Sequence, residues 1–214
     1  MPPLRHYGLL RFARNDGDGE GEAMNQKNLL EVDWSKIPAP VDDGAAAHLM
    51  GMVIPDVTLL ATDDSSVTLS ALAGRTVVFA YPRTGEPGKI SLVDDWDMIP
   101  GARGCTPQTC SFRDLFAELK AAGVKHVFGL STQDNAYQTE MASRLHLPFP
   151  VLSDEKLKLT RALNLPTMEV AGLTLIKRLA LIVDDGRIAH VFYPVFPPDR
   201  NAADVLAWLK ENPR

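Results

Sequence analysis

The stretch Ile99-Pro-Gly-Ala-Arg-Gly-Cys105-Thr-Pro-Gln-Thr-Cys110-Ser-Phe-Arg-Asp114 contains both cysteines of this 214-residue chain. Upstream of it, the apolar run Thr76-Val-Val-Phe-Ala-Tyr81 is typical of a buried strand, and a long loop separates the two. Thr106-Pro107 indicates a helix start, because proline is well tolerated in the first helical turn. From Phe112 to Gly123, apolar residues repeat at helical spacing. The sequence therefore predicts that Cys105 lies at a helix N-terminus that follows a buried strand.

Strand and helix patterns alternate on both sides of this stretch. They predict strands over residues 57–61, 67–69, 76–81, 124–130, 148–152, 173–183 and 187–193, and helices over 106–123, 135–145, 155–163 and 202–210. Asp185-Gly186, between the last two strands, is a strong hairpin signal. Parallel strands need helical crossovers, whereas a hairpin is antiparallel. We therefore predict an α/β fold with a central mixed β-sheet and helices on both faces.

The first part of the chain differs from the rest. Residues 14–22 mix charge and glycine without any sustained period, which is typical of a flexible segment. We predict an N-terminal extension over residues 1–45, flexible or loosely docked, and one domain over residues 46–214. A better-patterned stretch opens at Met24, so both Met1 and Met24 are candidates for the natural start.

Charge and hydropathy exclude several classes of function. The formal net charge is -5, whereas a protein that binds nucleic acid needs a basic face. No stretch approaches the roughly 20 continuous apolar residues of a membrane helix. The N-terminus lacks the pattern of a signal peptide. We therefore expect a soluble, cytoplasmic protein that binds neither nucleic acid nor a membrane.

The two cysteines are interpreted as a redox pair. They are too few for the disulfide framework of a small secreted domain or for a tetrahedral zinc site, and the nearest downstream histidine is His126. A helix N-terminus favours thiolate over thiol at Cys105, and Arg103 would add positive charge. Cys110 lies farther into the predicted helix. It is therefore the better candidate for a second thiol that reacts with an oxidised Cys105.

This pair also predicts a conformational change. Five residues along a helix rise about 7.5 Å, more than the roughly 7 Å that two bridged Cα atoms can span. We therefore predict that oxidation of Cys105 to sulfenic acid is followed by local unfolding of the first turn, after which Cys110 forms the disulfide. The alternative is that both cysteines merely pack, since free cysteine is often a small core residue. It is stronger for Cys110, which could face the core beside Phe112 and Leu115.

The motif from Gly104 to Asp114 resembles the peroxiredoxin family, in particular its bacterioferritin-comigratory or Q-type group. The group's signature is Gly-Cys-Thr, a second Cys five residues after the first, and then Ser-Phe-Arg-Asp. Further matches occur in the family's order at Phe79-Ala-Tyr-Pro82, Leu130-Ser131, Phe149-Pro-Val-Leu-Ser-Asp154 and Arg178-Leu-Ala-Leu-Ile-Val-Asp184. The resemblance covers roughly residues 52–209.

The resemblance implies a thioredoxin-like fold and a thioredoxin-dependent peroxidase of the atypical 2-Cys kind, without metal or organic cofactor. Its substrates would be hydrogen peroxide or organic hydroperoxides, and thioredoxin or a similar dithiol would recycle an intramolecular Cys105–Cys110 disulfide. Cys105 matches the peroxidatic cysteine, Cys110 the resolving cysteine, and Arg178 the strand arginine that polarises the peroxide. A guanidinium can stabilise a thiolate and hydrogen-bond peroxide oxygens. The alternative for Arg178 is a surface position on a strand. We expect a monomer or a weak homodimer.

One part of the family pattern is displaced. In the family a Pro and a Thr stand shortly before the reactive cysteine, but the corresponding positions here are Met98 and Ala102. Pro82-Arg83-Thr84 resembles the beginning of the motif, as though about residues 85–102 had been inserted after it. Thr84 would then supply the hydroxyl that bonds the thiolate or the peroxide; the alternative is an ordinary loop residue. The insertion itself would be a lid, a partner surface, or a loop over the edge of the core.

Two other functions stay open on the sequence. A thioredoxin-like dithiol oxidoreductase would suit the fold, although it would usually carry Cys-x-x-Cys, which this chain lacks. A peroxide sensor without turnover would use the oxidation of Cys105 to change the surface that a partner recognises.

Overall fold

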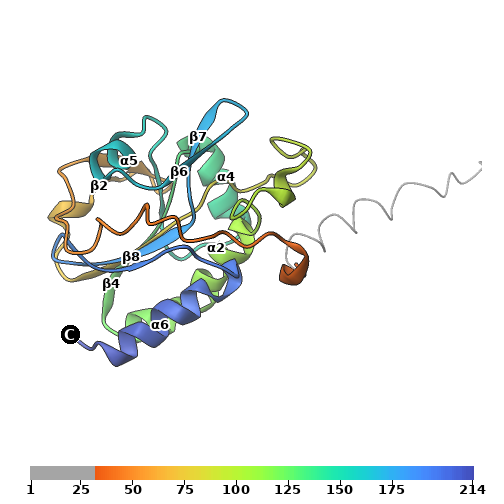
Figure 1. Ribbon diagram of the computed structural model, residues 1–214. Helices are drawn as coiled ribbons and strands as arrows, with labels where there is room; N and C mark the ends of the chain where they lie inside the picture. Colours follow the sequence, from red (N-terminus) through yellow and green to blue (C-terminus); the bar gives the residue numbers. More distant parts are fainter. Residues whose placement is uncertain (1–31) are drawn as a thin grey trace, which may run out of the picture.

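The computed structural model describes residues 32–214. The predictions about residues 1–31, their flexibility and the choice of start, lie outside the described residues. Figure 1 shows a central sheet between helices, with the C-terminus at the end of helix α6. The division into an extension and a domain that begins at residue 46 stays a prediction.

Seven strands form the central sheet, in the order β2-β1-β5-β4-β3-β8-β9. Their bounds are β1 Thr58–Ala61, β2 Ser66–Thr68, β3 Arg75–Ala80, β4 Val124–Ser131, β5 Val151–Ser153, β8 Leu179–Asp184 and β9 Arg187–Phe192. Strands β3, β4 and β5 are parallel, and the other pairings in this sheet are antiparallel. The prediction of a mixed sheet is confirmed.

Helices cover both faces of this sheet. Successive side chains of a strand point to opposite faces, so each face of the sheet packs with its own set of core residues. The α-helices are α2 Cys105–Asp114, α3 Phe116–Ala121, α4 Asn135–Arg144, α5 Lys158–Leu163 and α6 Asn201–Glu211; short 3-10 helices are η1 Trp34–Lys36, η2 Leu69–Ala71, η3 Trp96–Met98 and η4 Pro198–Arg200. In β3, Val77 and Phe79 pack with side chains of α2, α3, α4 and α6. Val78 and Ala80 pack on the opposite face with α5. Figure 1 shows α2 beside α6, where the two helices are in contact.

The single helix predicted over residues 106–123 is wrong, since the chain forms two helices that are separated at Leu115. Leu115 has φ -100° and ψ 12°, which interrupts the helical geometry. Phe112 before the break and Leu119 after it pack in the same core cluster. Because the apolar spacing continues across the break, periodicity did not reveal it.

The single strand predicted over residues 173–183 is also wrong. Residues Leu173–Ile176 form β7, which pairs with β6 (Thr167–Val170) in a separate hairpin, and β8 starts only at Leu179. Ala171 and Gly172 both have positive φ at the turn of this hairpin. Arg178 lies in the break between β7 and β8 and is buried. Lys177 and Arg178 interrupt the apolar run at this point, but apolar residues continue on both sides of them, so the pattern resembles that of one strand.

The predicted hairpin at Asp185-Gly186 is confirmed. Strands β8 and β9 pair antiparallel on either side of it. Asp185 has φ 47° and Gly186 has φ 77°, the left-handed values that a tight two-residue hairpin turn requires.

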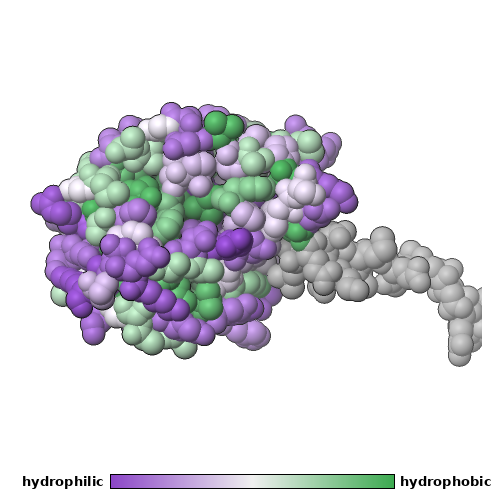
Figure 2. Space-filling view, turned by 60° about the horizontal axis from the view of Figure 1, so that its bottom comes forward, coloured by the Kyte–Doolittle hydropathy of each residue, from purple (hydrophilic) through white to green (hydrophobic). Residues whose placement is uncertain are grey.

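The face shown in Figure 2 has hydrophobic residues scattered among hydrophilic ones, with a hollowed apolar area near its centre. Within residues 32–214, no helix combines the length and the apolar character needed to cross a membrane.

Candidate active site

Cys105 is the first residue of α2 and its side chain is buried. The preceding residue, Gly104, is the N-cap with φ 102°, and no side chain caps this helix start. The first N–H groups of α2 therefore lack a capping side chain and, with the helix dipole, favour a negative charge on the sulfur. The prediction that Cys105 lies at a helix N-terminus is confirmed.

Arg178 lies against the sulfur of Cys105. Its Nη2 is 3.2 Å from Cys105 Sγ and 3.0 to 3.2 Å from the backbone carbonyls of residues 101–103. Two protons on Nη2 cannot serve four acceptors at once, so a bond to the sulfur competes with bonds to these carbonyls. Arg178 is 2% exposed, which contradicts the alternative of a surface strand position. The buried charge beside Sγ stabilises a thiolate more than it would in water.

Gln108 holds Arg178 in this position, and the sequence reasoning missed it. Its Oε1 accepts a hydrogen bond from Arg178 Nη1, and its Nε2 donates to Asn201 Oδ1 at 2.9 Å. Asn201 is the first residue of α6, so the bond links the two helices. Gln108 is fully buried. A glutamine on the first turns of a helix gives no signal of this role until the tertiary fold brings Arg178 to it.

Cys110 lies in the same helix as Cys105, and both thiols are free. Burial raises the pKa of the Cys110 thiol, and the positive charge of Arg113 offsets this only in part. The thiolate form is therefore disfavoured at Cys110. Both cysteines belong to one core cluster, as the packing alternative supposed, and Cys105 also contacts Arg178.

Thr84 is buried near this site, but its hydroxyl donates to Gln133 Oε1 at 3.1 Å. Its backbone N–H donates to the same oxygen at 2.9 Å. The two neighbours of Thr84 in the chain, Arg83 and Gly85, line the hollow at Cys105. The structure therefore brings Cys105 and Arg178 into contact, and it holds the Thr84 hydroxyl on Gln133.

A small hollow of about 60 Å³ opens at Cys105. Its lining residues are Arg83, Gly85, Ser91, Trp96, Arg103, Gly104, Cys105, Thr106 and Pro107. The volume is about that of two water molecules at roughly 30 Å³ each, which suits a peroxide group. Three of these residues belong to the predicted insertion, residues 85–102. Arg103 contributes less free charge than the sequence suggested, because its Nη1 binds both carboxylate oxygens of Asp97 at 3.0 and 3.1 Å.

Tyr81 follows β3, is fully buried and lies close enough to Cys105 to be affected by its charge. Burial raises its pKa well above the usual value, and a negative charge on Cys105 raises it further. Its hydroxyl therefore stays neutral. Among residues 32–214, no group of three or more His, Cys, Asp and Glu side chains lies close enough together to hold a metal ion.

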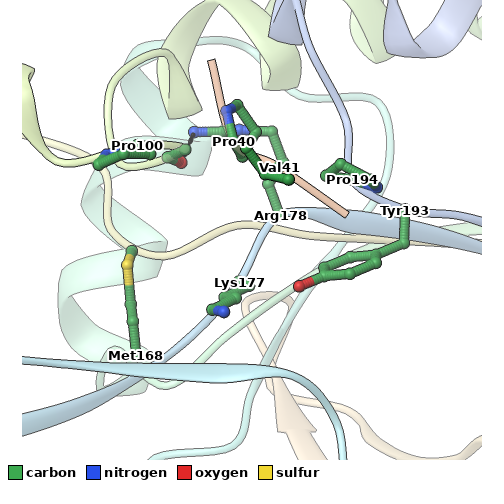
Figure 3. A pocket seen from close by; sticks show the side chains of 9 residues that line it. Pro40, Val41, Pro100, Met168, Lys177, Arg178, Tyr193 and Pro194 are labelled. Atoms are coloured by element: carbon green, nitrogen blue, oxygen red, sulfur yellow. Dashed lines mark hydrogen bonds between the residues drawn. The ribbon is translucent and has the colours of Figure 1, made fainter. Parts of the chain in front are cut away.

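The described part of the extension packs on the other side of Arg178. A hollow of about 100 Å³ lies there. Figure 3 shows its lining residues, with Pro40 and Val41 above Arg178, Met168 and Pro100 to one side, and Tyr193 and Pro194 to the other. Asp43 fixes this segment, because it accepts hydrogen bonds from Lys177 at 2.6 Å and from Tyr193 at 2.7 Å. The buried Nε of Arg178 has no hydrogen-bond partner within residues 32–214.

The tight packing at Gly104 gives a stability prediction. A Cβ at this position would lie 2.7 Å from both Trp34 Cη2 and Pro198 Cγ, and φ is 102°. We expect Gly104→Ala to lower the free energy of unfolding by about 2 to 4 kcal/mol, from left-handed strain of about 1 to 2 kcal/mol plus the clash. Urea unfolding measures it. Gly88→Ala is the control, because Gly88 has φ 75° and nothing within 4 Å of its Cβ position. Equal losses in the two variants would contradict the close packing.

Comparison with known proteins extends these observations. The profile of the family described as Redoxin matches residues 49–206. Peroxiredoxin Q, chloroplastic, of Oryza sativa subsp. japonica is 32% identical over 162 residues, which are 75% of this chain and 66% of that protein, just under two thirds. Peroxiredoxin Bcp of Escherichia coli K12 is 32% identical over 167 residues, 76% of this chain and 96% of that protein.

Solved structures show the same fold. Peroxidoxin BcpB from Mycobacterium tuberculosis has a TM-score of 0.62 at 24% identity, over 77% of this chain and 98% of that chain. A PrxQ mutant from Xylella fastidiosa has a TM-score of 0.60 at 19% identity, over 76% of this chain and 95% of that chain. The prediction of a thioredoxin-like fold is confirmed by these neighbours.

Proposed function

The chain belongs to the redoxin family, within its peroxiredoxin Q and Bcp group, and on this premise we propose that it is a thiol-dependent peroxidase whose reactive group is Cys105. One observation supports the assignment of Cys105 as the reactive group. Cys105 lies at an uncapped helix start with the guanidinium of Arg178 3.2 Å from its sulfur, next to a hollow of peroxide size. This environment favours the thiolate, which is the nucleophilic form.

In the proposed first step, the Cys105 thiolate attacks the terminal oxygen of the hydroperoxide. An S–O bond forms, the O–O bond breaks, and the leaving oxygen takes up a proton to give water or an alcohol. The sulfur is thereby oxidised by two electrons to sulfenic acid, and the peroxide is reduced. Arg178 and the N–H groups at the start of α2 stabilise the charge that moves onto the leaving oxygen.

We propose that Cys110 then attacks the sulfenic sulfur, forms the disulfide with Cys105 and releases water. Both cysteines lie in α2, which supports the need for the first turn to unwind before they can bond. Thioredoxin or a similar dithiol would reduce the disulfide, as in an atypical 2-Cys enzyme. For Thr84 we propose a bond from its hydroxyl to the thiolate or the peroxide. This bond requires a rotation away from Gln133.

The test of this function is stopped-flow oxidation of the reduced protein by hydrogen peroxide, followed by turnover with thioredoxin and its reductase. Fast oxidation with sustained turnover would support the peroxidase. Fast oxidation without turnover by any dithiol donor would favour the sensor. Slow oxidation together with reduction of insulin disulfides would favour the dithiol oxidoreductase.

Cys110→Ser tests the resolving step. We expect this variant still to be oxidised by hydrogen peroxide but to stop at a Cys105 sulfenic acid that a dimedone-type reagent labels, because no second thiol is available. Turnover with thioredoxin should fall at least about tenfold. Mass spectrometry of the oxidised proteins measures both. An ordered disulfide within an intact α2 would contradict the unwinding step, and normal turnover of the variant would contradict the role of Cys110.

Monomer or weak homodimer, and a cytoplasmic location, stay predictions, and several plant relatives are named as chloroplastic.

A further inference from the structure

A second hollow, of about 290 Å³, lies beside the one at Cys105. We call it the side hollow; it is lined by Arg83, Thr84, Gly85, Lys89, Ile90, Ser91, Leu92, Trp96 and Tyr137. Four of these residues, Arg83, Gly85, Ser91 and Trp96, also line the hollow at Cys105. The two hollows are therefore adjacent, and a molecule that extends from one into the other would contact these four residues.

The insertion builds most of the side hollow. Gly85 and residues 89–92 and 96 come from it, while Tyr137 comes from α4. Figure 1 shows this loop beside α4 and the start of α2. Trp96 is buried in a cluster with Ala102 and with side chains of the β6–β7 hairpin, so the loop is fixed on the body of the protein. This packing fixes the wall of the side hollow that Trp96 and Leu92 form.

The lining combines apolar surface with positive charge and contains no carboxylate. Trp96 and Leu92 offer apolar contact area, and the Ile90 side chain is 98% exposed at this site. Lys89 also lines the space, but its ammonium group pairs with Glu86 at 2.6 Å. Arg83 is the cation whose charge is least offset.

Arg83 is held in place by an aromatic ring and not by an acid. Its guanidinium lies over the Tyr137 ring, 4.9 Å from the ring centroid. Tyr137 in turn donates from its hydroxyl to the Thr84 carbonyl at 3.1 Å, which fixes the ring. Within residues 32–214, no carboxylate forms an ion pair with Arg83. A guanidinium that stacks on a ring keeps its N–H donors in a plane that matches a carboxylate.

We propose that the side hollow binds the organic part of a hydroperoxide that carries both an apolar body and a carboxylate. The carboxylate pairs with Arg83, the apolar body lies against Trp96 and Leu92, and the peroxide group faces Cys105. A cavity of about 150 Å³ is enough to bind benzene, so the side hollow of about 290 Å³ has room for a substituted benzene ring. This inference rests on the proposed peroxidase function and names the substrate class of the same site.

The test compares two substrates that differ by one carboxylate group. Cumene hydroperoxide is neutral, and its para-carboxylated analogue adds the carboxylate to the same ring. We expect the wild-type protein to be oxidised about tenfold faster by the carboxylated compound, which is the usual scale of one charge-assisted hydrogen-bonded pair. In Arg83→Gln this ratio should fall to about one, and Arg83→Lys should keep part of it. The ratio is the readout, so an overall loss of speed does not affect the conclusion.

Arg161→Gln is the matched control, because Arg161 is an exposed arginine on α5, whose side chains pack on the opposite face of the sheet. The ratio of the two oxidation rates in Arg161→Gln should equal the ratio in the wild-type protein. A ratio near one in the wild-type protein, or an unchanged ratio in Arg83→Gln, would overturn the proposal.

A binding measurement separates this proposal from the peroxidase function. Para-isopropylbenzoate and para-isopropylbenzyl alcohol are unreactive analogues, and titration calorimetry on the reduced wild-type protein gives their Kd values. We expect the carboxylate to bind about tenfold tighter than the alcohol, and Arg83→Gln to remove the difference. If no hydroperoxide oxidises Cys105 quickly but the carboxylate still binds more tightly than the alcohol, the peroxidase proposal fails and the proposal that the side hollow binds a carboxylate is kept. Equal binding of the two analogues would overturn the proposal about the side hollow and leave the peroxidase proposal unaffected.

Discussion

Cys105→Ser is expected to abolish peroxide reduction, with the second-order rate constant for oxidation by hydrogen peroxide lowered by at least about 10³-fold. A serine hydroxyl is a much weaker nucleophile than a cysteine, and its oxygen cannot form the sulfenic acid intermediate. The remaining thiol, Cys110, cannot substitute, because burial raises its pKa and so reduces its thiolate fraction. Stopped-flow kinetics with thiol counts before and after the reaction measures the effect.

Cys110→Ser is the control for this experiment, because it removes the other thiol from the same helix. Fast oxidation of Cys105→Ser combined with slow oxidation of Cys110→Ser would reverse the two roles. Because Ser and Cys differ little in volume, both variants should keep the fold, and thermal unfolding checks this.

Arg178→Gln is expected to lower the rate constant for oxidation by about 10²- to 10³-fold, the usual cost of removing one charged donor at a transition state. The variant loses the positive charge 3.2 Å from Cys105 Sγ, and with it the stabilisation of the thiolate and of the leaving oxygen. It also frees the carbonyls of residues 101–103, to which Nη2 donates. The rate should therefore be measured together with thermal unfolding and the ultraviolet absorbance of the thiolate.

Arg178→Lys separates charge from geometry. An ammonium group keeps the charge but lacks the planar fork that reaches Gln108, the carbonyls and the sulfur together. We expect this variant to lie between the wild type and Arg178→Gln in rate and in thiolate absorbance. A wild-type rate in Arg178→Gln, at unchanged stability, would remove the arginine from the mechanism.

The position of Cys105 at a helix start was predictable because its signals are local. A proline in the first turn and an apolar repeat after it indicate a helix start wherever the segment lies in space. The structure places Cys105 at that start. The hairpin at Asp185-Gly186 was predictable for the same reason, since left-handed φ values restrict the residue types at two adjacent positions.

The break at Leu115 and the bend at Arg178 were not predictable. Apolar spacing reports which side of a segment is buried, and both segments stay buried on either side of the irregularity. For Arg178, the resemblance implied a position on a strand. The structure shows it in a bend, where it leaves the sheet pattern to meet the carbonyls of residues 101–103 and the sulfur.

The fold class, the order of strands and helices in outline, and the helix start at Cys105 could all be predicted from the amino-acid sequence, because each depends on residues that are neighbours along the chain. The folded molecule was needed to find that Gln108 joins Arg178 to Asn201, that the Thr84 hydroxyl faces Gln133, and that the insertion and Tyr137 line a hollow with Arg83. The three hydrogen bonds join residues that are 49 to 93 positions apart in the sequence. Their geometry follows from how helices and loops pack on the sheet, and side-chain spacing along the chain does not encode it.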